Sequence, residues 1–194
     1  MKIHHMILTF LAVTLLNNPT LAQEYSEEQM KELYEMMNPG AEHDMLKQYE
    51  GDWALEYEYR MGMDQEPLTS PGEGKIEMIL GNRFMKWSSK GEMMGQQVES
   101  LMILGFDKRI KKFTIYGFDT MGTYAVSAQG EQDFEAGIIT FEGTNYEPAF
   151  NKVMRYQMRF NTNDKDKIDF SVLFESPDGK EFLPVVKVSG IRVE

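Results

Sequence analysis

The stretch DWALEYEYRMGM, Asp52 to Met63, alternates large apolar side chains with polar or small ones at every position. The apolar set consists of Trp53, Leu55, Tyr57, Tyr59, Met61 and Met63. A strict period of two is typical of a β-strand with one buried face, because successive side chains of a strand point to opposite sides. We therefore expect a strand at 52–63 whose aromatic face turns toward a core.

The same alternation recurs along the rest of the chain, most clearly in MRYQMRF from Met154 and in IDFSVLF from Ile168. Weaker copies fill the intervals between these segments. The predicted strands are 52–63, 73–80, 83–91, 95–106, 112–119, 122–130, 137–144, 151–161, 166–175 and 181–193. The sequence therefore predicts a mainly β protein of about ten strands.

Short turn-forming segments separate these strands, among them Thr69–Gly72, Gly81–Asn82 and Ser176–Gly179. None is long enough for the helix that connects parallel strands, so consecutive strands should pair as antiparallel hairpins. A meander of ten strands avoids exposed edges by closing into a barrel. The interior of such a barrel either holds a small ligand or is filled by its own side chains.

Two short helices are expected before the first strand. Ser26 and Gln29 form a capping-box pattern that predicts a helix from about Ser26 to Met37. Asn38-Pro39-Gly40 breaks that helix, and a second one is expected over 41–49, ended by Gly51.

The first 22 residues have the features of a secretory signal peptide: Lys2, an apolar run over 6–16, and small residues up to Ala22. Eleven apolar residues make about 16 Å of helix, roughly half of the hydrocarbon core, so no stable membrane anchor is expected. We expect a signal peptide at 1–22, a helical segment at 23–38 and a barrel domain at 39–194. Cleavage near Ala22 predicts a periplasmic or secreted protein.

The composition excludes several classes of function. With 31 acidic and 20 basic side chains the formal net charge is −11, which disfavours binding to nucleic-acid phosphates. The chain has no cysteine, so disulfides, thiolate nucleophiles and metal sites built on sulfur are excluded. Nine of its 16 methionines fall in or beside the predicted strands and mix there with aromatic residues, which indicates packing rather than a copper site.

Several ordered motifs resemble a bacterial family of unknown function called DUF1579. The motifs are Pro39-Gly40, Glu42-His43, Leu46, Gly51, Trp53, Gly81, Arg83-Phe84, Met94-Gly95, Leu104-Gly105-Phe106-Asp107, Asp119-Thr120-Met121-Gly122 and Gly179-Lys180-Glu181-Phe182. The resemblance runs from Pro39 to Arg192 and implies a lipocalin-like or calycin-like barrel. It implies no established activity.

His43 lies in the second expected helix and is the one histidine beyond the predicted cleavage site. It is expected at a barrel mouth, where a structural hydrogen bond is favoured over a ligand or acid–base role. A heme site like that of the nitrobindins would need a histidine in a late strand, and none follows His43. The sequence predicts no cofactor and no metal.

Arg83 shares a strand face with Met85 and Trp87 if the alternation of 83–91 holds. It should then point inward, where its charge needs a carboxylate or a ligand anion. An internal partner such as Asp119 or Glu99 and a ligand anchor are both open.

The expected function is binding of a small apolar or amphipathic ligand in the lumen. The candidate ligand-binding residues are His43, Trp53, Tyr57, Arg83, Trp87, Asp119 and Tyr156. The chain has no known catalytic motif, so we assign no catalytic residue. An enzyme using Glu42, His43 or Asp119 at the mouth and an interaction domain with a solid barrel are the alternatives, and the oligomeric state is open.

Overall fold

The computed structural model describes residues 25–62, 65–148 and 151–193. The chain divides into two compact units after Asn38. The predicted signal peptide lies outside the described residues.

The first unit contains α2, Glu27–Met37, capped as the sequence predicts. The amide of Gln29 donates to Ser26 Oγ at 3.2 Å, and the amide of Ser26 donates to Gln29 Oε1 at 2.8 Å. No residue of α2 is buried. No helix in the described part of the chain is both long enough and apolar enough to cross a membrane.

The second unit begins with α3, Ala41–Lys47, which is shorter than the expected 41–49. The amides of Gln48, Tyr49 and Glu50 bond to carbonyls three residues back, at 3.1–3.2 Å, so the helix tightens into a turn. This turn brings Tyr49 into the core, where it is 1% exposed.

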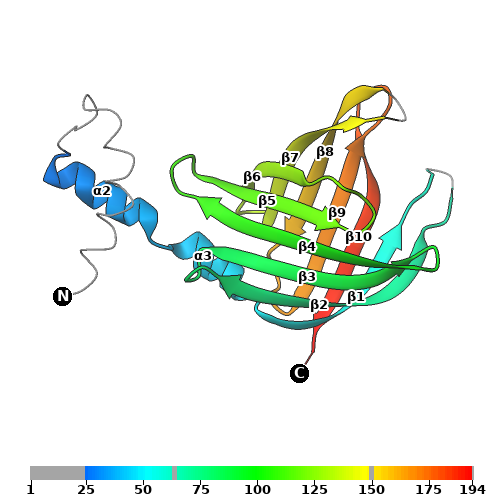
Figure 1. Cartoon of the computed structure of the whole chain (residues 1–194), viewed down its shortest axis with the longest axis horizontal. Helices are drawn as coiled ribbons and strands as arrows, with labels where there is room; N and C mark the ends of the chain where they lie inside the picture. The colour runs from blue at the N-terminus through cyan, green and yellow to red at the C-terminus, as the bar shows by residue number, and fades with distance from the viewer. Residues whose placement is uncertain (1–24, 63–64, 149–150, 194) are drawn as a thin grey trace. The chain divides into compact units, whose positions relative to one another are not determined.

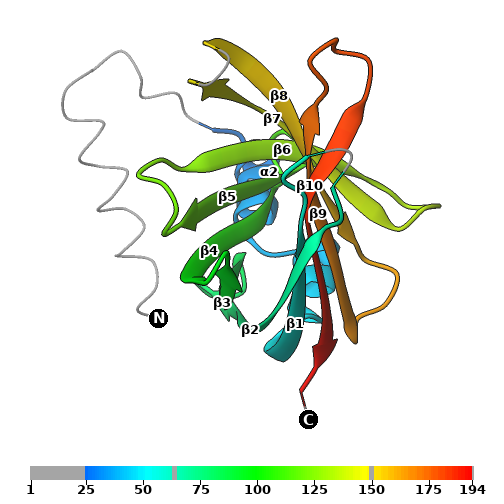
Figure 2. The same cartoon turned by 90° about the vertical axis from the view of Figure 1, so that its right-hand side faces the viewer.

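Ten antiparallel strands follow and close into a barrel, which confirms the predicted β class and topology (Figure 1). The strands are β1 (Gly51–Tyr59), β2 (Leu68–Ile79), β3 (Phe84–Met93), β4 (Gln96–Asp107), β5 (Lys112–Asp119), β6 (Val126–Asp133), β7 (Ile138–Glu147), β8 (Lys152–Asn161), β9 (Lys167–Glu175) and β10 (Phe182–Arg192). Each pairs with its neighbour in sequence, and β1 pairs with β10 to complete the ring. Figure 2 shows the strands curving round this ring.

The expected turn at Thr69–Gly72 is wrong, because these residues belong to β2. Pro71 lies opposite Glu56 of β1, while the pairing of β2 with β3 begins only at Gly72. Because Pro71 has no partner in β3, its missing N–H costs no hydrogen bond to that strand. A proline is tolerated at such an edge-like position. The first strand is also shorter than expected: it ends at Tyr59, and Met61 is exposed.

The end of the barrel beside α3, called the α3 end below, is filled by its own side chains. Leu46 and Tyr49 join a core in which most inward residues of this half are at most 2% exposed. These inward residues include Trp53, Ile76, Met85, Leu104, Ile115, Ile139, Phe160 and Ile168. This half of the barrel is solid.

The opposite end, where β1 ends and β4 begins, is called the far end. Tyr59 and Met154 are buried there, but several other inward-facing apolar side chains are only partly buried. They include Met93, Met102, Val126, Val172, Phe174 and Val186. Because these side chains still contact solvent, the far end is packed less completely than the α3 end.

The seam between β1 and β10 is held by Arg192, which lies opposite Trp53. Its guanidinium donates to the carbonyls of Glu50, Gln48 and Lys165, and its Nε donates to Asp166 at 3.1 Å. It also lies over the Trp53 ring, with 4.6 Å from Cζ to the ring centroid. One side chain thus joins the end of α3, the β8–β9 turn and the seam.

Candidate functional site

Four of the seven proposed ligand-binding residues lie inside the barrel: Trp53, Tyr57, Trp87 and Tyr156 are at most 8% exposed. The polar groups of two of them are already bonded. Trp53 Nε1 donates to Tyr49 O at 3.0 Å, and the Tyr156 hydroxyl donates to Ser127 O at 2.7 Å. Tyr57 and Trp87 are therefore the two that lead to a polar site in the lumen.

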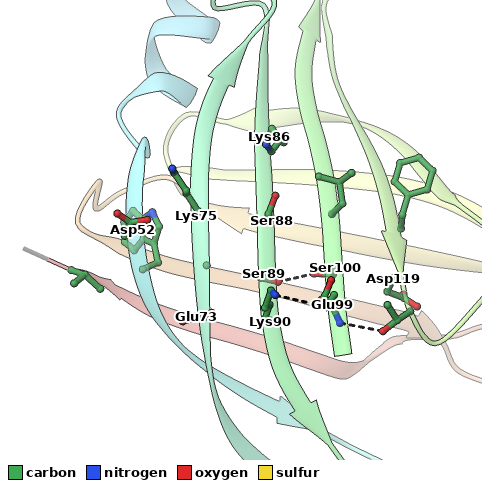
Figure 3. A pocket seen from close by; sticks show the side chains of 16 residues that line it. Asp52, Glu73, Lys75, Lys86, Ser88, Ser89, Lys90, Glu99, Ser100 and Asp119 are labelled. Carbon is green, nitrogen blue, oxygen red and sulfur yellow. Dashed lines mark hydrogen bonds and ion pairs between the residues drawn. The ribbon is translucent and has the colours of Figure 1, made fainter. Parts of the chain in front are cut away.

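A short chain of hydroxyl groups crosses the interior between β1, β3 and β4. Tyr57 donates to Ser89 Oγ at 2.8 Å, and Ser89 Oγ lies 2.7 Å from Ser100 Oγ, a contact drawn in Figure 3. The three groups carry three protons and make two bonds. One serine proton is therefore left over, whichever serine donates to the other.

Trp87 supplies a second unused donor two residues before Ser89 on β3. Its Nε1 is fully buried and has no hydrogen-bond partner among the described residues. The indole lies against Gly74, where an added methyl group would come within 3.0 Å of Nε1. A buried donor without an acceptor costs about 1–3 kcal/mol, so this group favours an acceptor that arrives from outside the chain.

The interior holds no charge to compete for these donors. Among the described residues, the buried polar side chains are His43, Ser89, Gln157 and Ser176. Burial raises the pKa of Tyr57, against the hydrogen bond to Ser89, and raises the pKa of Tyr59 to about 12. Both phenols therefore stay protonated and neutral at physiological pH.

His43 lies at the α3 end and is 5% exposed. Its Nδ1 accepts the backbone N–H of Gly40 at 3.1 Å, and its ring meets the Phe106 ring edge to face at 6.3 Å between centroids. Burial is the main cause that lowers its pKa, and Lys108 and Arg83 act in the same direction. Nδ1 is thus taken up by the start of α3, which matches the favoured structural role.

Arg83 does not point into the barrel, so that prediction is wrong. It is exposed, in the turn before β3, and its guanidinium donates to the carbonyls of Leu80 and Gly81 at 3.2 Å each. Leu80, Gly81 and Asn82 all have positive φ, and this tight turn interrupts the alternation one residue before the strand begins. Glu99 is paired with Lys90 at 3.0 Å, and no lysine or arginine is among the buried side chains of the described residues.

Asp119 is exposed at the far end of β5, where its Oδ1 accepts the Met121 amide at 2.8 Å. His43 packs at the other end of the barrel, near the start of β5. Seven residues of strand separate the two ends of β5, about 23 Å. Asp119 and His43 cannot therefore act in one catalytic site.

Asp119 also borders a groove of about 1040 Å³ on the outer face of β1–β5. Figure 3 shows its charged side chains, and they are largely paired: Lys90 lies 3.0 Å from Glu99, and Glu77 lies 2.9 Å from Lys86 and 3.3 Å from Lys75. Cross-strand ion pairs of this kind belong to a solvated sheet surface. Ser89 and Ser100 border the groove as well, so the hydroxyl chain lies between the groove and the interior of the barrel.

A smaller pocket of about 410 Å³ opens at the α3 end, between the β4–β5 and β6–β7 turns. Phe106, Phe113 and Phe134 line it, together with Lys108, Lys111 and Glu42. The Phe106 and Phe113 rings are 4.9 Å apart between centroids. Across the described ranges, no group of three or more His, Cys, Asp or Glu side chains is placed to hold a metal ion.

Sequence reasoning missed Ser89, Ser100 and this pocket. The alternation of Met85 and Trp87 continues to Ser89, so an inward serine could have been read from the pattern. The position of Ser100 beside it depends on the register of β3 with β4, and the pocket depends on which two turns lie side by side. Neither is written in a local pattern.

Comparison with known proteins places the chain in a family. The model of the family "Protein of unknown function (DUF1579)" matches residues 38–187, so the chain belongs to this family. No curated protein matches it in sequence.

Two solved structures share the fold. The crystal structure of Rv2717c from M. tuberculosis has a TM-score of 0.56 at 12% identity, over 81% of this chain and 100% of that one. The S-type phycobiliprotein lyase CPES from Guillardia theta has a TM-score of 0.53 at 9% identity, over 80% of this chain and 94% of that one. At these identities the likeness concerns the fold alone.

Proposed function

We propose that this DUF1579 protein is a calycin-like carrier that binds a small, uncharged, largely apolar ligand through the far end of its barrel. The observation that carries the proposal is the pair of unused donors, Trp87 Nε1 and the spare serine proton, in an uncharged interior. An oxygen acceptor on the ligand, such as a carbonyl, would satisfy them. The partly exposed apolar residues of the far end would enclose its hydrocarbon part.

The charge of the lumen separates this ligand from a fatty acid. A carboxylate carried into the interior would lose its hydration and meet no cation, because Arg83 lies outside. A neutral ketone, ester or amide loses less on entry. The likeness to a lyase named for phycobiliproteins supports a ligand-holding barrel without naming the ligand.

We also propose, from the sequence, that the protein is exported after cleavage at Ala22. The signal-like order of Lys2, the apolar run and the small residues supports this location. A carrier of apolar molecules between membranes would work in such a compartment.

The test compares three probes of equal chain length: undecanone, undecane and undecanoate. Tryptophan emission reports binding, because Trp87 lies at the site. We expect undecanone to bind about tenfold more tightly than undecane, the effect of about one net hydrogen bond, and undecanoate to bind weakly. The Trp87→Phe variant, followed by calorimetry because it lacks the reporter, should lose most of the preference for the ketone, whereas Ser100→Ala leaves the spare proton on Ser89 and should keep it.

Ser88→Ala is the matched control, since Ser88 is the neighbour of Ser89 that faces the outer groove. It should leave all three affinities unchanged. Equal binding of ketone and alkane would mean that a buried water satisfies the donors. Binding of none of the probes would reject the carrier function.

A further inference from the structure

The pocket at the α3 end is separate from the lumen site, because the filled half of the barrel lies between them. Its base is the pair Phe106 and Phe113, which face each other across β4 and β5. Phe113 is 2% exposed, so the base is fixed by the core. A volume of about 410 Å³ lies within the usual range of small-molecule sites.

Phe134 forms one wall and is 83% exposed, the most exposed large apolar side chain of the described residues. It lies in the turn between β6 and β7, next to the opening. A phenyl ring in water, beside two more rings in a concave site, is typical of a surface that a ligand covers.

The charged side chains that line the opening are two lysines and two glutamates, Lys108, Lys111, Glu42 and Glu131. Lys111 lines it from the β4–β5 turn and makes no ion pair with any described residue. Glu131 on the opposite wall is paired with Lys112 at 3.4 Å. Glu42 and Lys108 are neighbours, since a methyl group on Gly40 would lie 3.5 Å from Glu42 Oε2 and 3.5 Å from Lys108 Nζ. The ammonium of Lys111 is therefore the uncompensated charge.

We propose that this pocket binds a small aromatic anion, a molecule of one or two rings with a single carboxylate or sulfonate. Its rings contact Phe106, Phe113 and Phe134, and its anionic group faces Lys111. Three aromatic walls select a flat apolar body, and one free ammonium selects one negative charge. This ligand carries a negative charge, whereas the ligand proposed for the lumen is neutral.

Anilinonaphthalene sulfonate is the probe, and the uncharged N-phenylnaphthylamine is its partner with the same rings. We expect the sulfonate to bind the wild type with increased emission, and the affinity to fall about fivefold to tenfold in Lys111→Gln and in Phe134→Ala. Raising the salt concentration from about 0.05 M to about 0.5 M should weaken binding to the wild type and hardly affect Lys111→Gln. The uncharged probe should not respond to Lys111→Gln.

Two variants of exposed residues outside the pocket serve as controls: Lys152→Gln and Tyr124→Ala. Both should bind the sulfonate as the wild type does, and so should Trp87→Phe, which tests the lumen independently. Equal affinity in all variants, or no binding, would overturn the proposal. A loss in Phe134→Ala without any effect of Lys111→Gln or salt would contradict an anionic ligand. The side chains of Lys111 and Phe134 are exposed, so circular dichroism should show an unchanged fold for Lys111→Gln and Phe134→Ala.

Discussion

The imidazole of His43 uses Nδ1 as an acceptor for the Gly40 N–H, so a proton on Nδ1 would break that bond. Burial already lowers the pKa of this group below its ordinary value of 6.5, with Lys108 and Arg83 adding to the effect and Glu42 and Asp44 opposing it. The unfolded chain therefore takes up the proton first as the pH falls. Because His43 binds a proton more readily in the unfolded chain, a falling pH favours unfolding.

We expect the free energy of unfolding to decrease as the pH falls from 6.5 toward the lowered pKa of His43. Urea unfolding on either side of this window measures it. In His43→Gln the amide oxygen can still accept from Gly40, and the decrease should be smaller. Parallel pH profiles of the two proteins would contradict the assignment. Asp107, whose pKa is lowered to about 2 by Arg109, titrates below this window in both.

Arg83 and Ser89 show what a residue pattern can and cannot predict. Alternation puts Ser89 inward correctly, because it lies within the strand. The same alternation fails for Arg83, because positive φ angles at Leu80 and Asn82 turn the chain before β3 begins. An alternating pattern does not show at which residue the strand begins.

At the scale of elements, β1 packs on β2 and β3 through the Tyr57 ring, which contacts Gly72 and Gly91. A methyl group on Gly91 would come within 2.8 Å of the Tyr57 ring, and its three nearest atoms, out to 3.5 Å, all belong to that ring. A methyl group on Gly72 would lie 2.5 Å from the same ring but also 2.5 Å from the Lys90 carbonyl oxygen. A methyl group on Gly91 thus meets a side chain, whereas one on Gly72 also meets backbone.

Gly91→Ala should therefore lower the free energy of unfolding by about 1–3 kcal/mol in the wild type. In the Tyr57→Val background the same change should cost almost nothing, because the ring is gone. Gly72→Ala should stay costly in both backgrounds. Chemical unfolding of the six proteins gives both double-mutant cycles. If Gly72→Ala also costs almost nothing in the Tyr57→Val background, the backbone at Lys90 must be able to move away, and the prediction is wrong.

Turn residues and alternation predicted many strand ends, but β6, expected at 122–130, begins at Val126 and ends at Asp133. Pro71 is the instructive exception. A proline next to a glycine is a turn signal in isolation, yet here it continues β2, because β2 still pairs with β1 at Pro71 while its pairing with β3 stops at Gly72. Local chemistry cannot reveal where the pairing with a neighbouring strand stops.

At the scale of the whole molecule, Arg192 holds the ring closed with bonds to three carbonyls and a carboxylate. Arg192→Lys keeps the charge but loses the planar fork that reaches several acceptors at once. We expect it to lower the free energy of unfolding by about 2 kcal/mol in urea titrations.

Arg155→Lys is the matched control, because Arg155 is an arginine on the outer face of β8 whose side chain is 52% exposed. It should cost less than about 0.5 kcal/mol. An equal effect of the two substitutions would mean that Arg192 does not hold the seam. The barrel itself was predictable from the short turns, but the register of β1 with β10 was not, because no local turn joins them.

The pairing order of the barrel also sets how it can form. Nine of the ten strand pairs join neighbours in sequence, so each can zip up locally at little cost in chain entropy. Only the β1–β10 pair joins segments from opposite ends of the domain. Loop closure delays such a contact, so ring closure should be the last event of folding and the slow one. Until then both β1 and β10 present open edges, and this interval is when two nascent chains would exchange strands or aggregate.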